Sequence, residues 1–268
     1  MGALQGKTAV VLGASAKGGS GWAIAEALAR EGCKVLVAAR RSAPLRDLAA
    51  DIGGASFACD ATKEDDIAAL GAEAKRLFGK VDIAINSAGA PERGPIKTAS
   101  RDALQRTLDL NYIAHVFFVQ HMAEAIREHG SIVIVSSMSA VCQTDASVFA
   151  YSCAKAAANC LVRCAAIEYG PRDIRVNAIC PGPIESAASR GLFQDQELRH
   201  AFEKEVPLGR IAQPEDIANA AVWLAGPAFV TGLDLQVNGG NFLCRFPTPR
   251  ELPGGVAAFE KRPLPPLA

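Results

Sequence analysis

Short runs of apolar residues alternate along the chain with longer segments in which apolar positions recur at helical spacing. The first run is "TAVVL" at 8–12, and a helix-like stretch, "AIAEALAREG", follows at 23–32. Runs that are apolar throughout, rather than at every second position, are typical of parallel strands covered by helices on both faces. The predicted strands are 7–12, 34–39, 55–59, 81–86, 131–136, 174–180 and 234–238, and helical patterns between them include 63–78, 102–129 and 151–169.

This alternation predicts an α/β fold, a single-domain doubly wound parallel sheet of about seven strands with helices on both faces. The 268 residues are enough for one large domain, and we find neither an internal repeat nor a linker. We expect this domain to span 1–245. The remaining residues, 246–268, contain six prolines and continue neither a helix nor a sheet easily. We predict an extended tail lying on the body or on a neighbouring subunit, with disorder as the alternative.

Composition excludes several classes of protein. Lysine and arginine balance aspartate and glutamate at 28 each, so no basic face for a nucleic acid is expected. No uncharged apolar run reaches the roughly 18 residues of a membrane span. The N-terminal segment enters a strand pattern directly and lacks the apolar core of a secretion signal. We therefore predict a cytoplasmic protein that binds neither nucleic acid nor membrane.

Cysteine and histidine are present without the spacing of a metal site. The eight cysteines form no Cys-x-x-Cys pair, and we expect small buried thiols in a reducing compartment. The four histidines are scattered, and each is interpreted as a surface or packing residue. We expect no metal.

A glycine-rich loop, "GASAKGGSGWAIA" at 13–25, joins the first predicted strand to the first helix. Exposed backbone amides and a helix N-terminus in this position favour binding of an anionic phosphate. The spacing differs from the common dinucleotide fingerprint, because Ile24 stands where its third small residue belongs. It also differs from the phosphate loop of nucleoside triphosphatases, because Gly19 replaces the required lysine.

Further motifs follow in a fixed order. They are "NSAG" (86–89), the pair Ser136-Ser137, "YSCAK" (151–155), "RVNAICPGPIES" (175–186), "PLGRIAQPEDIANAAVWLA" (207–225) and "VTGLDLQVNGG" (230–240). Together with the glycine loop they closely resemble the short-chain dehydrogenase/reductase family of the Tyr-x-x-x-Lys type, from about residue 5 to 243. The resemblance implies a Rossmann-type fold and a nicotinamide dinucleotide cofactor. The proline-rich tail lies outside it.

The resemblance also implies which residues bind the cofactor. The family loop usually reads Gly-x-x-x-Gly-x-Gly, and the matching glycines here make a loop that is two residues longer, which leaves its path open. The implied cofactor contacts are Gly13, Ser15, Lys17, Gly19, Gly21, Trp22, Arg40, Arg41, Asp60, Ala61, Asn86, Ala88, Gly89, Tyr151, Lys155, Pro181, Gly182, Ile184 and Ser186.

The end of the second strand indicates which dinucleotide is used. An NAD site places a carboxylate there to accept from the ribose 2′-hydroxyl. This chain has Ala39 at that point, followed by Arg40 and Arg41. A guanidinium group suits a 2′-phosphate, and Lys17 could add a second cationic contact. The sequence therefore predicts NADP(H) in preference to NAD(H).

The candidate catalytic residues follow from chemistry and from the resemblance. Tyr151 and Lys155 lie four apart on one predicted helix, so they share a face. Hydride transfer to a carbonyl leaves an oxygen that needs a proton, and a nearby ammonium lowers the pKa of a tyrosine. By resemblance, Tyr151 is the general acid or base, Lys155 lowers its pKa and binds the nicotinamide ribose, and Asn111 anchors a water in a proton relay. Ser137, with Ser139 as the alternative, polarises the substrate oxygen.

The substrate is less well defined by the sequence. We expect 187–206 to form a lid that excludes water. The candidate pocket residues are mostly apolar: Met138, Val141, Cys142, Phe149, Leu192 and Phe193. They favour a small-molecule ketone or secondary alcohol that is neutral or partly hydrophobic, with a cyclic compound as one candidate and acyl-thioesters and sugars as alternatives. The leading hypothesis is thus an NADP-dependent carbonyl reductase or alcohol dehydrogenase.

Two other functions stay open at this point. A non-catalytic dinucleotide sensor could use the same fold, although binding alone would not require Tyr151. An enoyl reductase is supported by the lengthened glycine loop, but that branch normally separates its tyrosine and lysine more widely. We also expect a homo-oligomer, a tetramer or a dimer, formed through 102–129 and 151–169, since the second helix is rich in small residues.

Overall fold

The seven predicted strands form one parallel sheet in the order β3-β2-β1-β4-β5-β6-β7. The computed structural model describes residues 4–142, 146–187, 189–248 and 251–253. The strands are β1 (Thr8–Leu12), β2 (Lys34–Ala39), β3 (Ala55–Ala58), β4 (Ile83–Asn86), β5 (Gly130–Val135), β6 (Ile174–Pro181) and β7 (Asp234–Val237). The predicted fold class is confirmed. The strand order reverses between β1 and β4, where ligands of such sheets usually bind.

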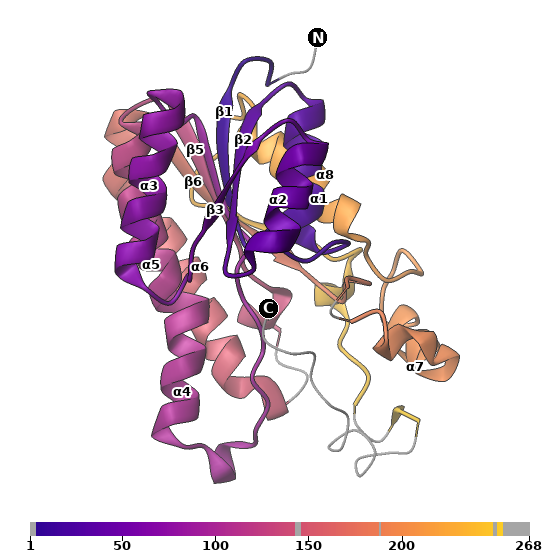
Figure 1. Cartoon of the computed structure of the whole chain (residues 1–268). Coiled ribbons are helices and arrows are strands. Elements are labelled where there is room, and N and C mark those ends of the chain that lie inside the picture. Colours follow the sequence, from indigo (N-terminus) through magenta and orange to yellow (C-terminus); the bar gives the residue numbers. More distant parts are fainter. Residues whose placement is uncertain (1–3, 143–145, 188, 249–250, 254–268) are drawn as a thin grey trace.

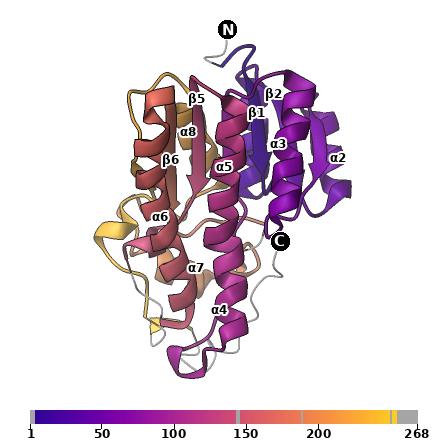
Figure 2. The same ribbon diagram turned by 90° about the vertical axis from the view of Figure 1, so that its left-hand side faces the viewer.

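Helices cover both faces of the sheet (Figures 1 and 2). They are α1 (Ser20–Arg30), α2 (Ser42–Asp51), α3 (Glu64–Phe78), α4 (Arg101–Leu108), α5 (Ala114–Ile126), α6 (Phe149–Tyr169), α7 (Gln196–Glu203) and α8 (Pro214–Ala225). Alternate residues of β1 enter different cores: Val10 and Leu12 pack with α3, α5 and α6, whereas Ala9 and Val11 pack with α1, α2 and α8. This two-sided burial explains why the strands are apolar throughout.

The helix predicted over 102–129 is interrupted. A turn of π-helix, Asp109–Ile113, separates α4 from α5, and the amide of Ala114 donates to the carbonyl of Asp109 five residues earlier. Helix α5 then ends at Ile126, because Arg127 adopts a positive φ of 66°. The expectation of one continuous helix was therefore wrong. Single π turns inside helices occur frequently at functional sites, and this one contains Asn111.

The segment expected to be a lid, 187–206, contains α7, which lies beyond the carboxyl ends of the strands (Figure 1). The described part of the proline-rich tail packs against it. Leu252 is 4% exposed and joins Leu198 and Ala201, and the ring of Phe202 lies edge-on to that of Phe246, 5.7 Å between centroids. Residues 249–250 and 254–268 of the predicted tail lie outside the described residues, and the division into domain and tail stays a prediction.

Among the described helices, none combines the length and the apolar character that crossing a membrane requires.

Candidate functional site

Two positions of the glycine loop require glycine, because neighbouring backbone atoms occupy the space that a side chain would need. Gly13 follows β1 with a φ of +92°, and a Cβ there would stand 2.5 Å from the amide nitrogen of Ala88. A Cβ on Gly21 would collide with the carbonyl oxygen of Gly13. The additional residues of the loop form a turn, in which the amide of Gly19 donates to the carbonyl of Ala16 at 2.8 Å. The loop thus keeps its backbone close to the carboxyl end of the sheet.

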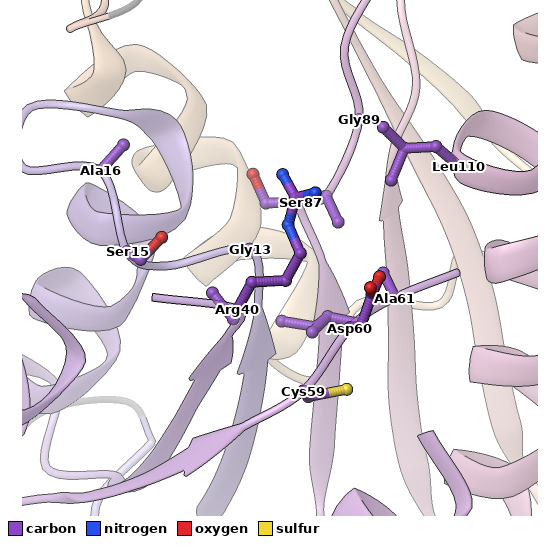
Figure 3. A pocket seen from close by; sticks show the side chains of 13 residues that line it. Gly13, Ser15, Ala16, Arg40, Cys59, Asp60, Ala61, Ser87, Gly89 and Leu110 are labelled. Carbon is purple, nitrogen blue, oxygen red and sulfur yellow. The ribbon is translucent and has the colours of Figure 1, made fainter. Parts of the chain in front are cut away.

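A cavity lies beside this loop, between the ends of β1, β2, β3 and β4 (Figure 3). Its lining includes the predicted contacts Gly13, Ser15, Arg40, Asp60, Ala61, Ala88 and Gly89. It also includes residues that sequence reasoning did not select: Leu12, Ala16, Ala39, Cys59, Ser87 and Leu110. All six are chain neighbours of predicted residues or of predicted motifs, Leu110 being next to Asn111, so extending each motif by one position would have found them.

The two adjacent arginines have different surroundings. Arg40 is exposed and its side chain points into the cavity (Figure 3). Burial alone would raise the pKa of Asp60, but hydrogen bonds from Thr62 and the charge of Arg40 lower that pKa below its usual value. Arg41 turns toward the glycine loop, where its Nε and Nη2 donate to the hydroxyl and the carbonyl of Ser15 at 3.3 and 3.2 Å. Arg41 does not line the cavity.

Three other predicted contacts lie beside the cavity rather than on it. The exposed amine of Lys17 lies 6.0 Å from the centre of the buried Trp22 ring. Asn86 is fully buried at the end of β4, and its Oδ1 accepts from the amide of Ala88 at 2.9 Å. Asn86 therefore fixes the turn that carries Ala88 and Gly89 into the cavity wall.

The predicted cofactor residues at 181–186 lie at the end of β6 and in the turn that follows it. A Cβ on Gly182 would be 2.8 Å from Cβ of Asn238 and 3.2 Å from Sδ of Met138, so this turn is tightly packed. None of Pro181, Gly182, Ile184 and Ser186 lines the cavity that contains Arg40. This segment is joined to the glycine loop where the amide of Ala187 donates to the carbonyl of Gly18 at 3.0 Å.

Tyr151 and Lys155 occupy successive turns at the start of α6. The Lys155 side chain is buried, and its Nζ donates to the carbonyl of Val135, at the end of β5, at 2.9 Å. The same Nζ lies 5.6 Å from the centre of the Tyr151 ring. Ser137 shares a hydrogen bond with Tyr151. The structure therefore brings the predicted serine, tyrosine and lysine together.

Ser136, the other half of the serine pair, anchors the helix. Its hydroxyl donates to Oδ1 of Asn159 on α6 at 2.5 Å, and both side chains are buried. Because Asn159 lies one turn beyond Lys155, this bond fixes α6 against the end of β5. Sequence reasoning did not select Asn159, since a buried amide in a helix has no motif of its own.

Burial changes the pKa values of both side chains of the pair. Tyr151 keeps a partly exposed surface, yet desolvation raises its pKa to about 12, while the hydrogen bond with Ser137 lowers it. Burial lowers the pKa of Lys155 to about 7. Desolvation penalises the charged forms of both side chains. Lys155 is not among the causes of the Tyr151 shift, so the lowering of the Tyr151 pKa by Lys155 stays a prediction.

Asn111 holds the loop after β4. Its Nδ2 donates to the carbonyls of Ala90 and Thr107, both at 3.0 Å, and its Oδ1 accepts from the amide of Ala90 at 3.1 Å. A Cβ on Gly89 would lie 3.0 Å from both the Asn111 Oδ1 and the Lys155 Nζ. Gly89, which has no side chain, is thus the residue that lies between the cavity and Lys155.

A second pocket opens on Tyr151. Its lining comes from distant parts of the chain: Pro91, Arg93, Ser139, Val148, Tyr151, Phe202, Phe246, Pro247 and Leu252. None of the six apolar residues proposed from the sequence lines it. Met138 is fully buried, Val141 is 56% exposed, and Phe193 packs on Phe202. Four of the lining residues of this pocket come from α7 and the tail, which lie outside the motifs and could not be found from local spacing.

The expectation of buried thiols was wrong for half of the cysteines. Cys33, Cys59 and Cys180 are buried, but Cys153, Cys160, Cys164 and Cys244 are exposed. Helix α6 places its small residues Ala154 and Ala158 against the body and three of these thiols on the opposite face. Within the described residues, no group of three or more His, Cys, Asp or Glu side chains is placed to hold a metal ion.

Comparison with known proteins agrees with this geometry. Residues 13–241 match the family model described as Enoyl-(Acyl carrier protein) reductase. Over 246 residues the chain is 35% identical to 7alpha-hydroxysteroid dehydrogenase of Escherichia coli (strain K12), covering 89% of this chain and 95% of the relative. Over 254 residues it is 36% identical to 3beta-hydroxysteroid dehydrogenase 1 of Eggerthella lenta, covering 90% and 95%.

The fold is similarly matched among solved structures. The short-chain type dehydrogenase/reductase from Mycobacterium ulcerans superposes with a TM-score of 0.86 at 31% identity, covering 92% of this chain and 94% of that one. The relatives support a dehydrogenase/reductase that uses a nicotinamide cofactor. The chain therefore belongs to the short-chain dehydrogenase/reductase family.

Proposed function

We propose that the protein is an NADP(H)-dependent oxidoreductase that moves a hydride between nicotinamide and a ketone or secondary alcohol, with Tyr151 as the general acid or base. The proposal depends chiefly on one observation. Tyr151, Lys155 and the hydrogen-bonded Ser137 are together at the carboxyl end of the sheet, one residue from a cavity lined by glycine backbone.

The cavity fits a dinucleotide. Gly13 and Gly89 approach it where a Cβ would fill the space or strike a neighbour, which suits a ligand whose phosphates contact backbone amides. Ala39 stands where an NAD site carries a carboxylate, and the next residue, Arg40, points into the cavity. A guanidinium at this point supports a 2′-phosphate, hence NADP(H).

The chain's own residues supply the proton chemistry. When bound, the cofactor supplies or accepts the hydride. A Tyr151 pKa of about 12 keeps the proton on its Oη near neutral pH, ready for the substrate oxygen as negative charge develops there. Ser137 would donate a hydrogen bond to the same oxygen. Lys155, when protonated, would stabilise the phenolate left behind.

The pocket beside Tyr151 favours an apolar substrate. Most of its lining residues are apolar, Phe202, Phe246, Pro247 and Leu252 among them, and its polar lining residues are Ser139, Tyr151 and Arg93. An apolar body with one polar reacting group matches such a lining. We therefore propose a hydrophobic, ring-containing ketone or alcohol, the chemical class to which the substrates named for the two hydroxysteroid dehydrogenases belong.

A second function has one specific observation in its favour. The matching family model is described as an enoyl reductase, and the glycine loop is longer than usual. Against it, Tyr151 and Lys155 are four residues apart on one helix, and Ser137 contacts the tyrosine as a carbonyl-polarising serine would. A dinucleotide sensor would need none of these three side chains.

A substrate panel tests the proposal. The purified protein is mixed with NADPH or NADH and with cyclic ketones, ketosteroids, short aliphatic ketones or an enoyl thioester, and nicotinamide absorbance is followed. We expect oxidation of NADPH with the ring ketones and slower oxidation of NADH. Turnover of the enoyl thioester alone would establish the second function, and cofactor binding without any turnover would establish the sensor.

A further inference from the structure

His115 is a fully buried histidine beside the proposed catalytic lysine. It lies in the first turn of α5, directly after the π turn, with none of its surface exposed. Its Nε2 is 3.3 Å from Nζ of Lys155 on α6. Sequence analysis treated this histidine as a surface or packing residue, because it belongs to no motif.

The charge on Lys155 decides the tautomer. When Lys155 is protonated it has donors only, so Nε2 of His115 accepts and Nδ1 holds the ring proton; Nδ1 is buried and has no hydrogen-bond partner among the described residues. Burial, and then the charge of Lys155, lower the pKa of His115 well below its usual value, so the ring is neutral near pH 7. The other titratable groups around Lys155 are Tyr151 on its own helix and Cys180 on β6.

The contact also uses one of the three Lys155 donors. The carbonyl of Val135 accepts a second at 2.9 Å. The two acceptors are the carbonyl of the half-buried Val135 on β5 and the buried imidazole of His115 on α5. Because they belong to two different elements, together they fix the position of the amine. A Cβ on Gly89 would lie 3.0 Å from the same amine, so Lys155 adjoins the stretch of backbone that lines the cavity.

We infer that His115 is a positioning residue for Lys155: its neutral imidazole accepts a hydrogen bond from the ammonium, which holds the amine beside the cavity and keeps it protonated. This rests on the proposed role of Lys155. A hydrogen bond to the charged form of a group favours that form. Since Lys155 is otherwise destabilised as a cation by burial, losing this acceptor reduces the fraction of enzyme with a charged lysine.

The test compares three variants of the full-length protein. His115→Leu removes the acceptor at similar volume, and His115→Gln keeps an acceptor at a similar reach. His121→Leu is the matched control, because His121 lies on the same helix but next to Glu64 of α3. In protein with 13C-labelled lysine and no cofactor, NMR follows the titration of Lys155, whose resonance is identified by its loss in Lys155→Met.

We expect the Lys155 titration to move to lower pH by about one unit in His115→Leu, and hardly at all in His115→Gln and His121→Leu. The alkaline limb of kcat for ketone reduction should move in the same direction. Midway between the two limbs kcat should fall about threefold in His115→Leu, and the loss should approach about tenfold at higher pH, with a much smaller change in the KM of the ketone.

An unchanged Lys155 titration in a folded His115→Leu protein would overturn the inference, as would a fall in kcat that His115→Gln does not relieve. Failure of the proposed function is distinguishable from this. If Lys155→Met itself retained turnover, the proposed role of the lysine would be wrong, whereas the NMR titration would still report on the His115 contact. If His115→Leu does not fold, His115→Asn takes its place in the test, because the shorter asparagine side chain cannot reach Lys155. The Lys155 titration should then move to lower pH in His115→Asn.

Discussion

Arg40 provides the sharpest test of cofactor choice. Its side chain points into the cavity and its charge lowers the pKa of Asp60. The neighbouring Arg41 instead hydrogen-bonds Ser15 in the glycine loop. Arg40→Ala therefore removes a cation from the proposed phosphate site. Arg41→Ala instead removes the hydrogen bonds that hold Ser15 in the glycine loop. The two substitutions delete the same groups from adjacent positions and should have different consequences.

The magnitude follows from the bond that is lost. A hydrogen bond between a guanidinium and a phosphate contributes about 1.5–3 kcal/mol, equivalent to roughly a tenfold to 150-fold change in Kd. Because Arg40 is exposed, solvent screens the pair, and we expect about tenfold weaker binding of NADPH. NADH lacks the 2′-phosphate, so its Kd should change less than about threefold.

Fluorescence titration of both cofactors measures these values directly. Arg41→Ala should weaken NADPH and NADH by similar factors, since a loosened glycine loop affects the pyrophosphate that they share. Raising the salt concentration should reduce the difference between wild type and Arg40→Ala, because the interaction is between charges near solvent. Equal losses for NADPH and NADH in Arg40→Ala would refute the reasoning and leave Arg40 without a role in selecting the cofactor.

Three further predictions concern the scaffold. Gly21→Ala places a Cβ against the carbonyl of Gly13, so it should destabilise the fold by about 1–3 kcal/mol and weaken both cofactors, as thermal melts and titrations would show. Burial lowers the Lys155 pKa from 10.5 to about 7, so the unfolded chain binds more protons between these values and stability should rise with pH; denaturant melts of Lys155→Met should lack that rise. Ile167, 81% exposed, shares the outer face of α6 with exposed thiols, and if that face forms the expected homo-oligomer, Ile167→Glu should reduce the mass measured by light scattering.

Local patterns determined much of this fold. The central strands run between two helical layers and are mainly apolar, whereas the edge strands β3 and β7 are only partly buried. The bounds predicted for β2 are those of the structure, Lys34–Ala39. The motifs predicted the residues at the carboxyl ends of β1, β4 and β5 because a short segment positions each of them. Ser137, after β5, is such a residue, whereas Tyr151 and Lys155 are positioned by one short segment of α6, and the three lie together.

Contacts between distant segments could not be predicted in this way. The π turn at Asp109–Ile113 is not encoded by any local spacing that distinguishes it from ordinary helix. The wall formed by Phe246 and Leu252 depends on how the tail returns to α7. His115 was missed for a similar reason, since its significance comes from Lys155, 40 residues away.

Tyr151→Phe tests the central claim most directly, because it removes only the hydroxyl from the proposed acid. NADPH binding is measured by fluorescence titration and turnover of an accepted ketone by nicotinamide absorbance, at matched protein concentrations. We predict a Kd for NADPH within about threefold of wild type and a kcat reduced by at least about a hundredfold. A Tyr151→Phe protein that reduces the ketone at the wild-type rate would contradict the account.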